Sequence, residues 1–435
     1  MPGRQASFTL PDVKRMILCV GASALCLVVA GCASSPATLA AIPTSQAIGI
    51  TEPSATGFVP SASPVGPACP VATGTAVTLA PLGGGASPAD AVSAYLQAGG
   101  DPEPLAADLF ERGWVSPTSA VVWTDVDGDG RLDLAAGLTA APDPQGIASD
   151  GAVFVWRCQD GSYRRLEAAP RRPDHGLPAL REARDLTGDG VPDLLVAHPL
   201  CGAHTCYEQY SVLAWREGAL VERFQGASDD MPYPKLAIES DGPGAPAVIT
   251  VTATGIGSVG AGPYRMWTRS WTWDAASQTF QPGEAVFEAP RYRIHLLYDA
   301  DDAYNRGDIA AALDLYNRVI EDDTLLDWPG PGERRAQLSA YAAYRRVLAM
   351  LVSGDVEQAQ AESATRLTGT DPTTAAFAEL ARRLIAGASQ DALAGACAQV
   401  PAFAGDHADD LLAFLDFGYA NRSYSAHDLC SLPHD

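Results

Sequence analysis

The sequence predicts an α+β multidomain protein in which an antiparallel β repeat module is followed by an array of α-helical hairpins. Three observations predict this fold class. An Asp- and Gly-rich segment recurs within residues 115–290, and so does a strand–turn–strand pattern that carries a tryptophan. Residues 291–435 change to alanine-rich amphipathic patterns with the helical period. The chain has 435 residues, more than one ordinary core holds, so we expect several domains.

Residues 1–31 have the three parts of an export signal. The basic pair Lys14-Arg15 precedes an apolar and small run over residues 16–31, which ends in a small-residue cleavage site. That run is about 16 residues long, whereas a transmembrane helix needs about 20. A short membrane anchor helix is the alternative, and the length of the run disfavours it.

The run ends at Val29-Ala30-Gly31-Cys32, which resembles the lipobox of bacterial lipoproteins. In that family the cysteine is lipidated and becomes the mature N-terminus, so the resemblance implies a lipid anchor on Cys32. It also implies that the chain is exported and held at the outer face of a bacterial membrane. Residues 32–68 are rich in Ser, Thr, Pro, Ala and Gly, which is typical of a flexible linker.

The chain is strongly acidic, with 29 Lys and Arg residues against 52 Asp and Glu residues and a formal net charge of −23. Removing residues 1–31 takes away three positive charges and one negative charge, so the mature chain carries −25. So acidic a surface repels nucleic acid and anionic lipid headgroups. We therefore expect no nucleic-acid partner.

The cysteines predict disulfides. Cys19 and Cys26 leave with the signal, and Cys32 takes the lipid. The six that remain are Cys69, Cys158, Cys201, Cys206, Cys397 and Cys430. An even number in an exported chain indicates three disulfides, although six cysteines allow many pairings. We favour Cys201–Cys206 as a short clip and Cys397–Cys430 within the C-terminal region, which leaves Cys69–Cys158. The alternative for Cys201 and Cys206 is a zinc site shared with His198 and His204.

Residues 69–114 predict a short helical segment that leads into the β module. Residues 87–113 have a helical pattern that is interrupted at Asp101-Pro102. Gly100 and Gly113 are typical helix stops. We expect two short helices here.

An Asp-rich turn is the unit that recurs in the β module. Its first copy covers residues 123–138 and its second covers residues 183–198, so that Asp125 and Asp185 are 60 residues apart. A third, eroded copy covers residues 239–249. The strand–turn–strand patterns that follow the copies are centred on Trp156, Trp215 and Trp273. Repetition at this period is typical of repeat architectures, in which each unit needs neighbours to bury its faces.

The first copy has the oxygen-rich pattern of a cation-binding loop. Positions one, three, five and nine are Asp125, Asp127, Asp129 and Asp133. Gly130 at position six permits a sharp bend, and Arg131 at position seven can add its backbone carbonyl. This spacing aims oxygens at one hard cation, and calcium fits it best. Ala136 stands at position twelve, where a helix–loop–helix calcium hand has a bidentate glutamate, so that fold is disfavoured.

The later copies are weaker. The second loop keeps acids at positions one, five and nine, which are Asp185, Asp189 and Asp193. Thr187 stands at position three and Val191 offers its carbonyl at position seven, so we expect lower calcium affinity. Pro243 and Ala247 fall where acids belong in the third copy, so we expect no metal there. The alternative is that these Asp-Gly turns are ordinary hairpin turns without an ion. Repulsion among four acids in one loop favours calcium.

Asp-rich loops followed by alternating strand residues resemble the FG-GAP or VCBS-type repeats of calcium-binding β-propellers, including integrin alpha subunits. The likeness covers residues 115–285. It implies a partial β-propeller-like module whose calcium ions are structural and stiffen the turns between strands. Three blades are fewer than the roughly four to eight that close a propeller. We therefore expect a partial module, one that recruits flanking segments as blades, or an open stack of sheets.

The C-terminal region carries small residues, turn glycines and a packing aromatic at regular positions. They are Ala300, Gly307, Ala312 and Tyr316, then Gly354 and Ala359, then Gly387 and Ala392. The pattern resembles tetratricopeptide repeats (TPR) and covers most of residues 293–430. It implies closely packed helical hairpins and a concave groove for a peptide or protein partner. The alternative is a helical cap that covers the end of the β module.

No motif in the sequence predicts an enzyme. The chain has no nucleophile elbow, zinc-protease motif or phosphate-binding loop, and its seven histidines are scattered. We expect a membrane-tethered extracytoplasmic lipoprotein that acts as a calcium-stabilised binding or scaffolding module for protein or glycan partners. The alternatives are a secreted carboxylate-dependent hydrolase and a purely structural lipoprotein of the envelope.

Overall fold

The computed structural model describes residues 68–70, 77–82, 86–140, 150–202, 204–388 and 390–433, all within a compact unit that spans Phe58–Asp435. The predicted export signal, the lipidation site at Cys32 and the linker up to residue 67 lie outside the described residues. None of the helices in the described ranges is long and apolar enough to cross a membrane.

Two short helices precede the sheets, as the sequence predicts: α1 (Pro88–Gln97) and α2 (Pro102–Glu111). At the start of α1 the Ser87 hydroxyl accepts a hydrogen bond from the Asp90 N–H. The Asp90 side chain accepts one from the Ser87 N–H, which completes a capping box. The Asp101 side chain caps α2 by accepting a backbone N–H of its first turn. Both helices have proline in the first turn, where the missing N–H needs no partner.

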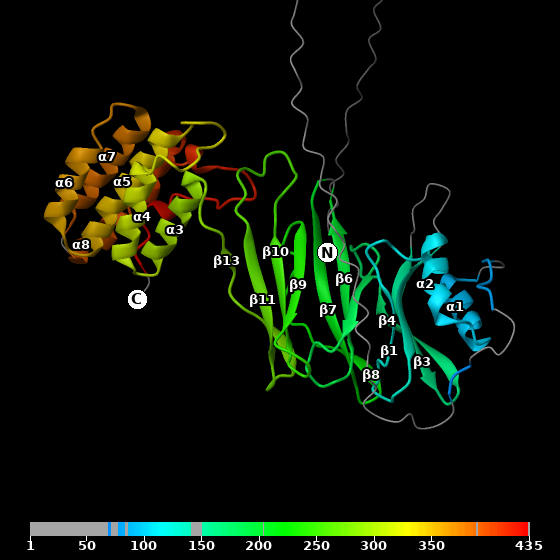
Figure 1. The fold of residues 1–435 in the computed structure, drawn as a ribbon. Coiled ribbons are helices and arrows are strands. Elements are labelled where there is room, and N and C mark those ends of the chain that lie inside the picture. Colours follow the sequence, from blue (N-terminus) through cyan, green and yellow to red (C-terminus); the bar gives the residue numbers. More distant parts are fainter. Residues whose placement is uncertain are drawn as a thin grey trace, which may run out of the picture. The chain divides into compact units, whose positions relative to one another are not determined.

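Three open antiparallel sheets follow the helices (Figure 1). Sheet 1 has the order β1-β2-β3-β4 and consists of β1 (Val121–Thr124), β2 (Asp133–Thr139), β3 (Gly151–Gln159) and β4 (Ser162–Pro170). Sheet 2 has the order β5-β6-β7-β8 and consists of β5 (Ala179–Arg184), β6 (Asp193–Cys201), β7 (Cys206–Arg216) and β8 (Ala219–Glu222). Sheet 3 has the order β12-β11-β10-β9, with β13 paired to β11, and consists of β9 (Pro234–Ser240), β10 (Ala247–Ala253), β11 (Trp267–Asp274), β12 (Thr279–Pro282) and β13 (Val286–Phe287).

Sheets 1 and 2 place their Asp-rich loops in the same position, between the first and second strands. In each sheet the ninth loop residue is also the first residue of the second strand. Asp133 lies opposite Thr124 in sheet 1, and Asp193 lies opposite Arg184 in sheet 2. The loop is therefore fixed at both ends by a strand pair, which holds its carboxylates in place.

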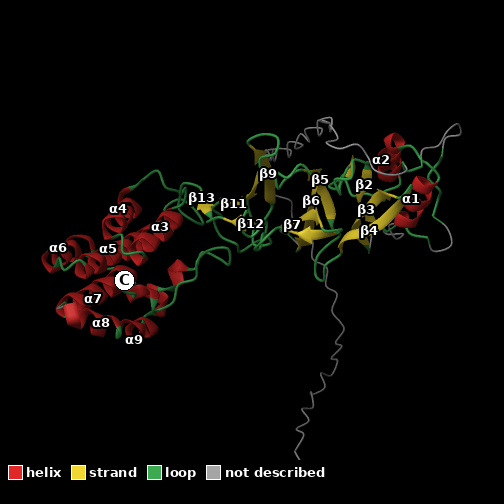
Figure 2. Ribbon diagram, turned by 90° about the horizontal axis from the view of Figure 1, so that it is seen from below, coloured by secondary structure: helices red, strands yellow, loops and turns green. Residues whose placement is uncertain are grey.

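Sheet 2 is buried on both faces. Leu194 and Val196 of β6 belong to a hydrophobic cluster with Val155 of sheet 1. Leu195, which stands between them in the sequence, belongs to a cluster with Ile249 of sheet 3. Successive side chains of a strand point to opposite faces, so β6 supplies both cores. Figure 2 shows the strands of sheet 2 between those of the other two sheets.

Helices α1 and α2 cover the other face of sheet 1. Trp156 of β3 is fully buried in a cluster with Leu96 of α1 and Leu109 of α2. Its indole N–H donates a hydrogen bond of 2.8 Å to the Ser93 hydroxyl. The polar edge of this large ring is thereby satisfied inside the core.

The C-terminal region is helical (Figure 1). Its helices are α3 (Arg293–Asn305), α4 (Ile309–Glu321), α5 (Arg335–Val352), α6 (Val356–Arg366), α7 (Pro372–Ala386), α8 (Gln390–Cys397), α9 (Val400–Asp406) and α10 (Ala408–Leu411). Two short 3-10 helices follow, Ala413–Leu415 and Asp428–Cys430. Helix α3 packs against α4, α4 against α5, and α5 against both α6 and α7.

Small residues stand at the close contacts of the first two helix pairs. Ala312 of α4 and Ala359 of α6 are fully buried. Gly307, between α3 and α4, has φ +78°, and Gly354, between α5 and α6, has φ +84°, a left-handed conformation that favours glycine at the end of a helix. Gly387 has φ −89°, so the third glycine of the predicted series does not take this conformation.

Three disulfides join the six cysteines that the sequence predicts to pair, and the pairing is the one that the sequence favours. They are Cys69–Cys158, Cys201–Cys206 and Cys397–Cys430, with sequence separations of 89, 5 and 33 residues. The first ties the segment before α1 to β3, the second closes the turn between β6 and β7, and the third joins α8 to the last 3-10 helix. Disulfides persist in oxidising compartments, so they are compatible with an extracytoplasmic protein.

A buried charge pair lies inside the helical region. Asp301 of α3 and Arg345 of α5 are 2% and 1% exposed. The Asp301 carboxylate lies 3.3 Å from the Arg345 Nε and accepts hydrogen bonds from the hydroxyls of Tyr316 and Tyr424. The Arg345 guanidinium also lies over the ring of Tyr304, 4.3 Å from its centre. The two charges are therefore enclosed by protein partners.

Candidate metal-binding loops

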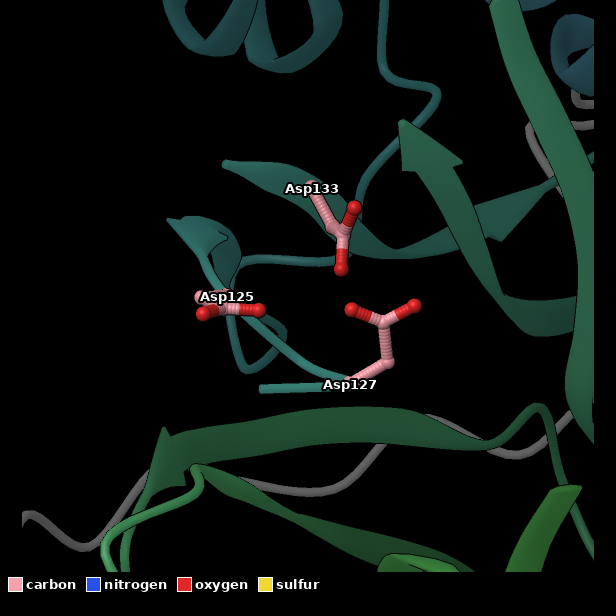
Figure 3. A group of neighbouring side chains, drawn as sticks. All are labelled: Asp125, Asp127 and Asp133. Atoms are coloured by element: carbon pink, nitrogen blue, oxygen red, sulfur yellow. The ribbon is translucent and has the colours of Figure 1, made fainter. Parts of the chain in front are cut away.

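The β1–β2 loop brings three carboxylates to one point. Asp125, Asp127 and Asp133 each offer one oxygen, and these oxygens all lie within 4.8 Å of one another (Figure 3). Asp125 is 3% exposed and Asp133 is fully buried. Carboxylate oxygens are the ligands that hard divalent cations such as calcium and magnesium take. No other group of three such ligand residues occurs in the part of the chain that the structure describes.

Backbone N–H groups hold these carboxylates in place. Asp125 accepts hydrogen bonds from the N–H of Asp129 at 3.0 Å and of Gly130 at 2.7 Å. Asp133 accepts one from the Val126 N–H at 3.0 Å and one from the Cys158 N–H at 2.7 Å. Gly130 has φ +86°, which allows the chain to turn back toward Asp125. The oxygens are thus fixed before any ligand arrives.

Burial and mutual repulsion make the ionised form of this cluster costly. Burial, followed by the nearby charges of Asp127 and Asp125, raises the pKa of Asp133 to about 7, although the N–H groups of Cys158 and Val126 act in the opposite direction. Burial also raises the pKa of Asp125, with a contribution from Asp127. A positive charge placed among these oxygens would favour their ionised forms.

Asp129 and Arg131, the other residues predicted for this site, lie together at its margin. Asp129 accepts a hydrogen bond of 2.9 Å from the Arg131 N–H, and its other oxygen lies 4.0 Å from the Arg131 guanidinium. The side chain of Asp129 is 35% exposed. The structure therefore brings three of the four predicted acids together and leaves the fourth beside them.

Arg157, which the loop spacing alone does not predict, also contacts the first Asp-rich loop. The Nε of Arg157, on β3, donates a hydrogen bond of 2.7 Å to Asp127, and its guanidinium lies 4.0 Å from the centre of the Trp215 ring. In sheet 2 the corresponding residue, Arg216, forms an ion pair with Asp189. The signal was present in the sequence, since Trp156-Arg157 and Trp215-Arg216 are the same dipeptide 59 residues apart.

The second loop has the same frame with fewer ligands. Asp185 accepts hydrogen bonds from the N–H of Gly188, Asp189 and Gly190. One oxygen of Asp193 accepts the N–H of Leu186 and of Thr187. The other Asp193 oxygen is buried and has no partner among the described residues. Burial raises the pKa of Asp193 to about 6. An orphaned buried carboxylate oxygen is suited to a cation.

Position three of the second loop faces an arginine. The Thr187 hydroxyl lies 3.5 Å from a guanidinium nitrogen of Arg216, and the Val191 N–H donates to Asp189 at 2.9 Å. The third copy, between β9 and β10, has a different turn. There the Ser240 hydroxyl lies 3.0 Å from the carbonyl oxygens of Gly242 and Ala245. This turn is held by a hydroxyl and backbone groups.

The alternative zinc site near the second loop does not form, because the Cys201–Cys206 disulfide uses both sulfur atoms. His204 is exposed in the same turn, whereas His198 of β6 is 1% exposed. Neither ring nitrogen of His198 has a partner among the described residues. Its ring centre lies 6.3 Å from that of His175. Burial, followed by the charges of Arg172 and His175, lowers the pKa of His198 to about 4.

His198 predicts an acid-sensitive sheet 2. Its folded pKa of about 4 lies below the ordinary value of 6.5, so the unfolded chain binds more protons between these two pH values. Stability is then fully present above pH 6.5 and falls as the pH drops toward 4. We expect this residue to contribute roughly 3 kcal/mol to that loss, at about 1.36 kcal/mol per pKa unit. The measurement is urea unfolding across this pH range.

The variant His198→Leu should flatten this pH dependence relative to the natural chain. His204→Leu removes an exposed histidine from the same β6–β7 hairpin and is the matched control. Equal pH profiles for the natural chain and His198→Leu would contradict the prediction.

Comparisons with models of protein families, with curated proteins and with solved structures find no match for this chain.

Proposed function

We propose that this chain is an exported, lipid-anchored protein that acts as a calcium-stabilised binding or scaffolding module outside the cytoplasmic membrane. The observation that carries the calcium proposal is the convergence of the Asp125, Asp127 and Asp133 oxygens within 4.8 Å. Arg157 balances the charge of Asp127 alone, so among the described residues the buried carboxylates of Asp125 and Asp133 still lack a balancing cation. Calcium takes six to eight oxygens, so about half of its shell could come from this loop.

The ligands of the first loop would be these three carboxylates, with Asp129 and the Arg131 carbonyl as further donors. In the second loop they would be Asp185, Asp189 and Asp193, with the hydroxyl of Thr187 and the carbonyl of Val191. The buried, unpartnered oxygen of Asp193 supports a cation there. With one acid fewer, the second loop should bind calcium more weakly.

The exported location is supported by two independent features. The lipobox-like sequence ending at Cys32 fits a lipid anchor, and the three disulfides fit an oxidising compartment. Free calcium is scarce inside cells and abundant outside them, so loops of this kind suit an exported chain.

We propose further that the sheets are blades of a partial, FG-GAP/VCBS-type β-propeller-like module and that the helices form a TPR-like array. Sheets 1 and 2 support the first proposal because they share strand order and the position of the Asp-rich loop. The left-handed Gly307 and Gly354 and the buried Ala312 and Ala359 support the second. Both types of array commonly present surfaces to protein or glycan partners, which is the basis for a binding or scaffolding role.

Calcium should raise the melting temperature of the metal-free protein. A ligand that binds only the folded state adds about 2.7 kcal/mol when present at about a hundredfold excess over its Kd. The variant Asp127→Asn keeps the shape of the side chain and removes one ligand charge, so most of the calcium shift should disappear. The measurement is differential scanning calorimetry with calcium and with a chelator.

Asp241→Asn is the matched control for this experiment. Asp241 occupies position three of the third copy, where Pro243 and Ala247 replace acids, and it is exposed. Its replacement removes the same charge and should leave the calcium shift unchanged. A melting temperature of the natural chain that does not respond to calcium would refute the calcium proposal.

A further inference from the structure

A cavity of about 340 Å³ opens between sheets 1 and 2, beside the first Asp-rich loop. Its walls come from Arg157 of β3, Arg164 and Leu166 of β4, and Trp215 and Leu220 of the β7–β8 hairpin. Small-molecule sites are commonly concave spaces of roughly 300–1,000 Å³ with a few charged groups among apolar ones. The cavity has the size and the composition of such a site.

Two arginines stand directly opposite each other in this cavity. Arg157 and Arg164 are register partners across the β3–β4 pair, so their side chains share one face of sheet 1. Val155, two residues before Arg157, packs against sheet 2, which identifies that face as the one turned toward the second sheet. Like charges opposite each other in a sheet are destabilising, so this arrangement needs negative charge nearby.

Among the described residues, an acidic side chain neutralises only one of these two arginines. Arg157 is held by Asp127 and by the ring of Trp215. Arg164 is exposed, and no described acidic side chain pairs with it. Glu167 is the one acid among the described residues that line the cavity, and its register partner is Phe154, on the opposite face of the sheet from Val155. Within the described ranges, Arg164 therefore has an unpaired guanidinium, whereas that of Arg157 is held by Asp127.

We propose that this cavity binds the phosphate group of a small soluble phosphate monoester, and that calcium in the first loop strengthens the binding. The second half of the proposal rests on the proposed calcium site. Two guanidinium groups present N–H forks that match the oxygens of a phosphate, whose double charge balances both arginines. The chain has a net charge of −23, so its surface as a whole repels anions. The attraction for a phosphate therefore has to come from the two arginines of the cavity.

Calcium strengthens the site through Asp127. Without calcium, the Asp127 carboxylate neutralises Arg157, and the acids of the first loop repel an approaching anion. A calcium ion among Asp125, Asp127 and Asp133 would share the Asp127 carboxylate, so that Arg157 is less neutralised and attracts an anion more strongly. The ion would also cancel part of the loop's negative charge. Both effects act in the same direction, and couplings between two ligands typically correspond to roughly 5–150-fold in affinity.

The test is isothermal titration calorimetry of the full chain in detergent with glucose 6-phosphate, with glucose as the uncharged comparator. In calcium we expect saturable binding of the phosphate ester and none of glucose. In chelator the affinity should fall by about tenfold. Arg164→Gln should lower the affinity by about tenfold or more, since it removes a charged guanidinium whose N–H groups can hydrogen-bond to phosphate oxygens.

The controls separate this inference from the proposed function. Arg306→Gln removes an exposed arginine at the end of α3, outside the cavity, and should bind as the natural chain does. Arg164→Lys keeps the charge without the fork and should bind with intermediate affinity. The phosphate site is refuted if calcium stabilises the chain but the chain binds no glucose 6-phosphate, or if Arg164→Gln binds it as tightly as the natural chain.

The coupling is refuted if the affinity for glucose 6-phosphate is the same with calcium and with chelator. In that case a melting temperature that also does not respond to calcium shows that the calcium site itself is absent.

Discussion

Replacing Asp301 by alanine is expected to lower the free energy of unfolding of the helical region by about 3–5 kcal/mol, because it leaves a buried charge without its partner. Arg345 is 1% exposed and would keep its positive charge inside the core. The hydroxyls of Tyr316 and Tyr424 would lose their acceptor at the same time. The measurement is urea unfolding followed by circular dichroism at the helical minimum.

Two further variants distinguish the effect of breaking the buried charge pair from the effect of removing any one acidic side chain. Asp314 of α4 is exposed, so Asp314→Ala should change stability by no more than about 0.5 kcal/mol. The double variant Asp301→Leu with Arg345→Met removes both charges and should recover part of the lost stability, because an apolar pair can replace a buried ion pair. Equal costs for Asp301→Ala and Asp314→Ala would contradict the prediction.

Removal of the Cys69–Cys158 disulfide should lower the free energy of unfolding by about 4.6 kcal/mol, because the unfolded chain gains conformational entropy when the cross-link is absent. The bond spans 89 residues and ties the segment before α1 to β3 of sheet 1. Cys158 is 3% exposed and is joined to the first Asp-rich loop by the hydrogen bond from its N–H to Asp133. The measurement is thermal unfolding of the Cys69→Ala, Cys158→Ala variant.

The three disulfides form an internal series for this prediction. The same relation gives about 3.7 kcal/mol for Cys397–Cys430, with a separation of 33, and about 2 kcal/mol for Cys201–Cys206, with a separation of 5. Alanine pairs at the three sites should therefore rank in the order of separation. A larger loss at Cys201–Cys206 than at Cys69–Cys158 would show that the long bond contributes little.

Local features of the chain were predictable from the sequence. The break at Asp101-Pro102 and the stops at Gly100 and Gly113 mark the ends of α1 and α2, because a helix end is set by its own few residues. The disulfide pairing was also predictable, since two short or regional pairs leave a single partner for Cys69. The position of Asp125, Asp127 and Asp133 at one point follows from alternate spacing in a single loop.

Features that depend on strand pairing were not predictable. Arg157 reaches Asp127 only because β3 pairs with β2, and 30 residues separate the two side chains in the sequence. Arg157 meets Arg164 through the β3–β4 register, and it meets Trp215 through the packing of sheet 1 on sheet 2. His198, which the sequence offered only as an alternative zinc ligand, is buried because it stands on the central strand pair of sheet 2. Sequence spacing carries no direct information on such contacts.

The double burial of β6 limits how this protein can be divided. Its alternate side chains complete the core with sheet 1 on one side and with sheet 3 on the other. A cut before sheet 2 would expose apolar surface on sheet 1, and a cut after it would expose apolar surface on sheet 2. The β region therefore offers no internal boundary for a soluble fragment, and a shortened chain for expression should keep all three sheets.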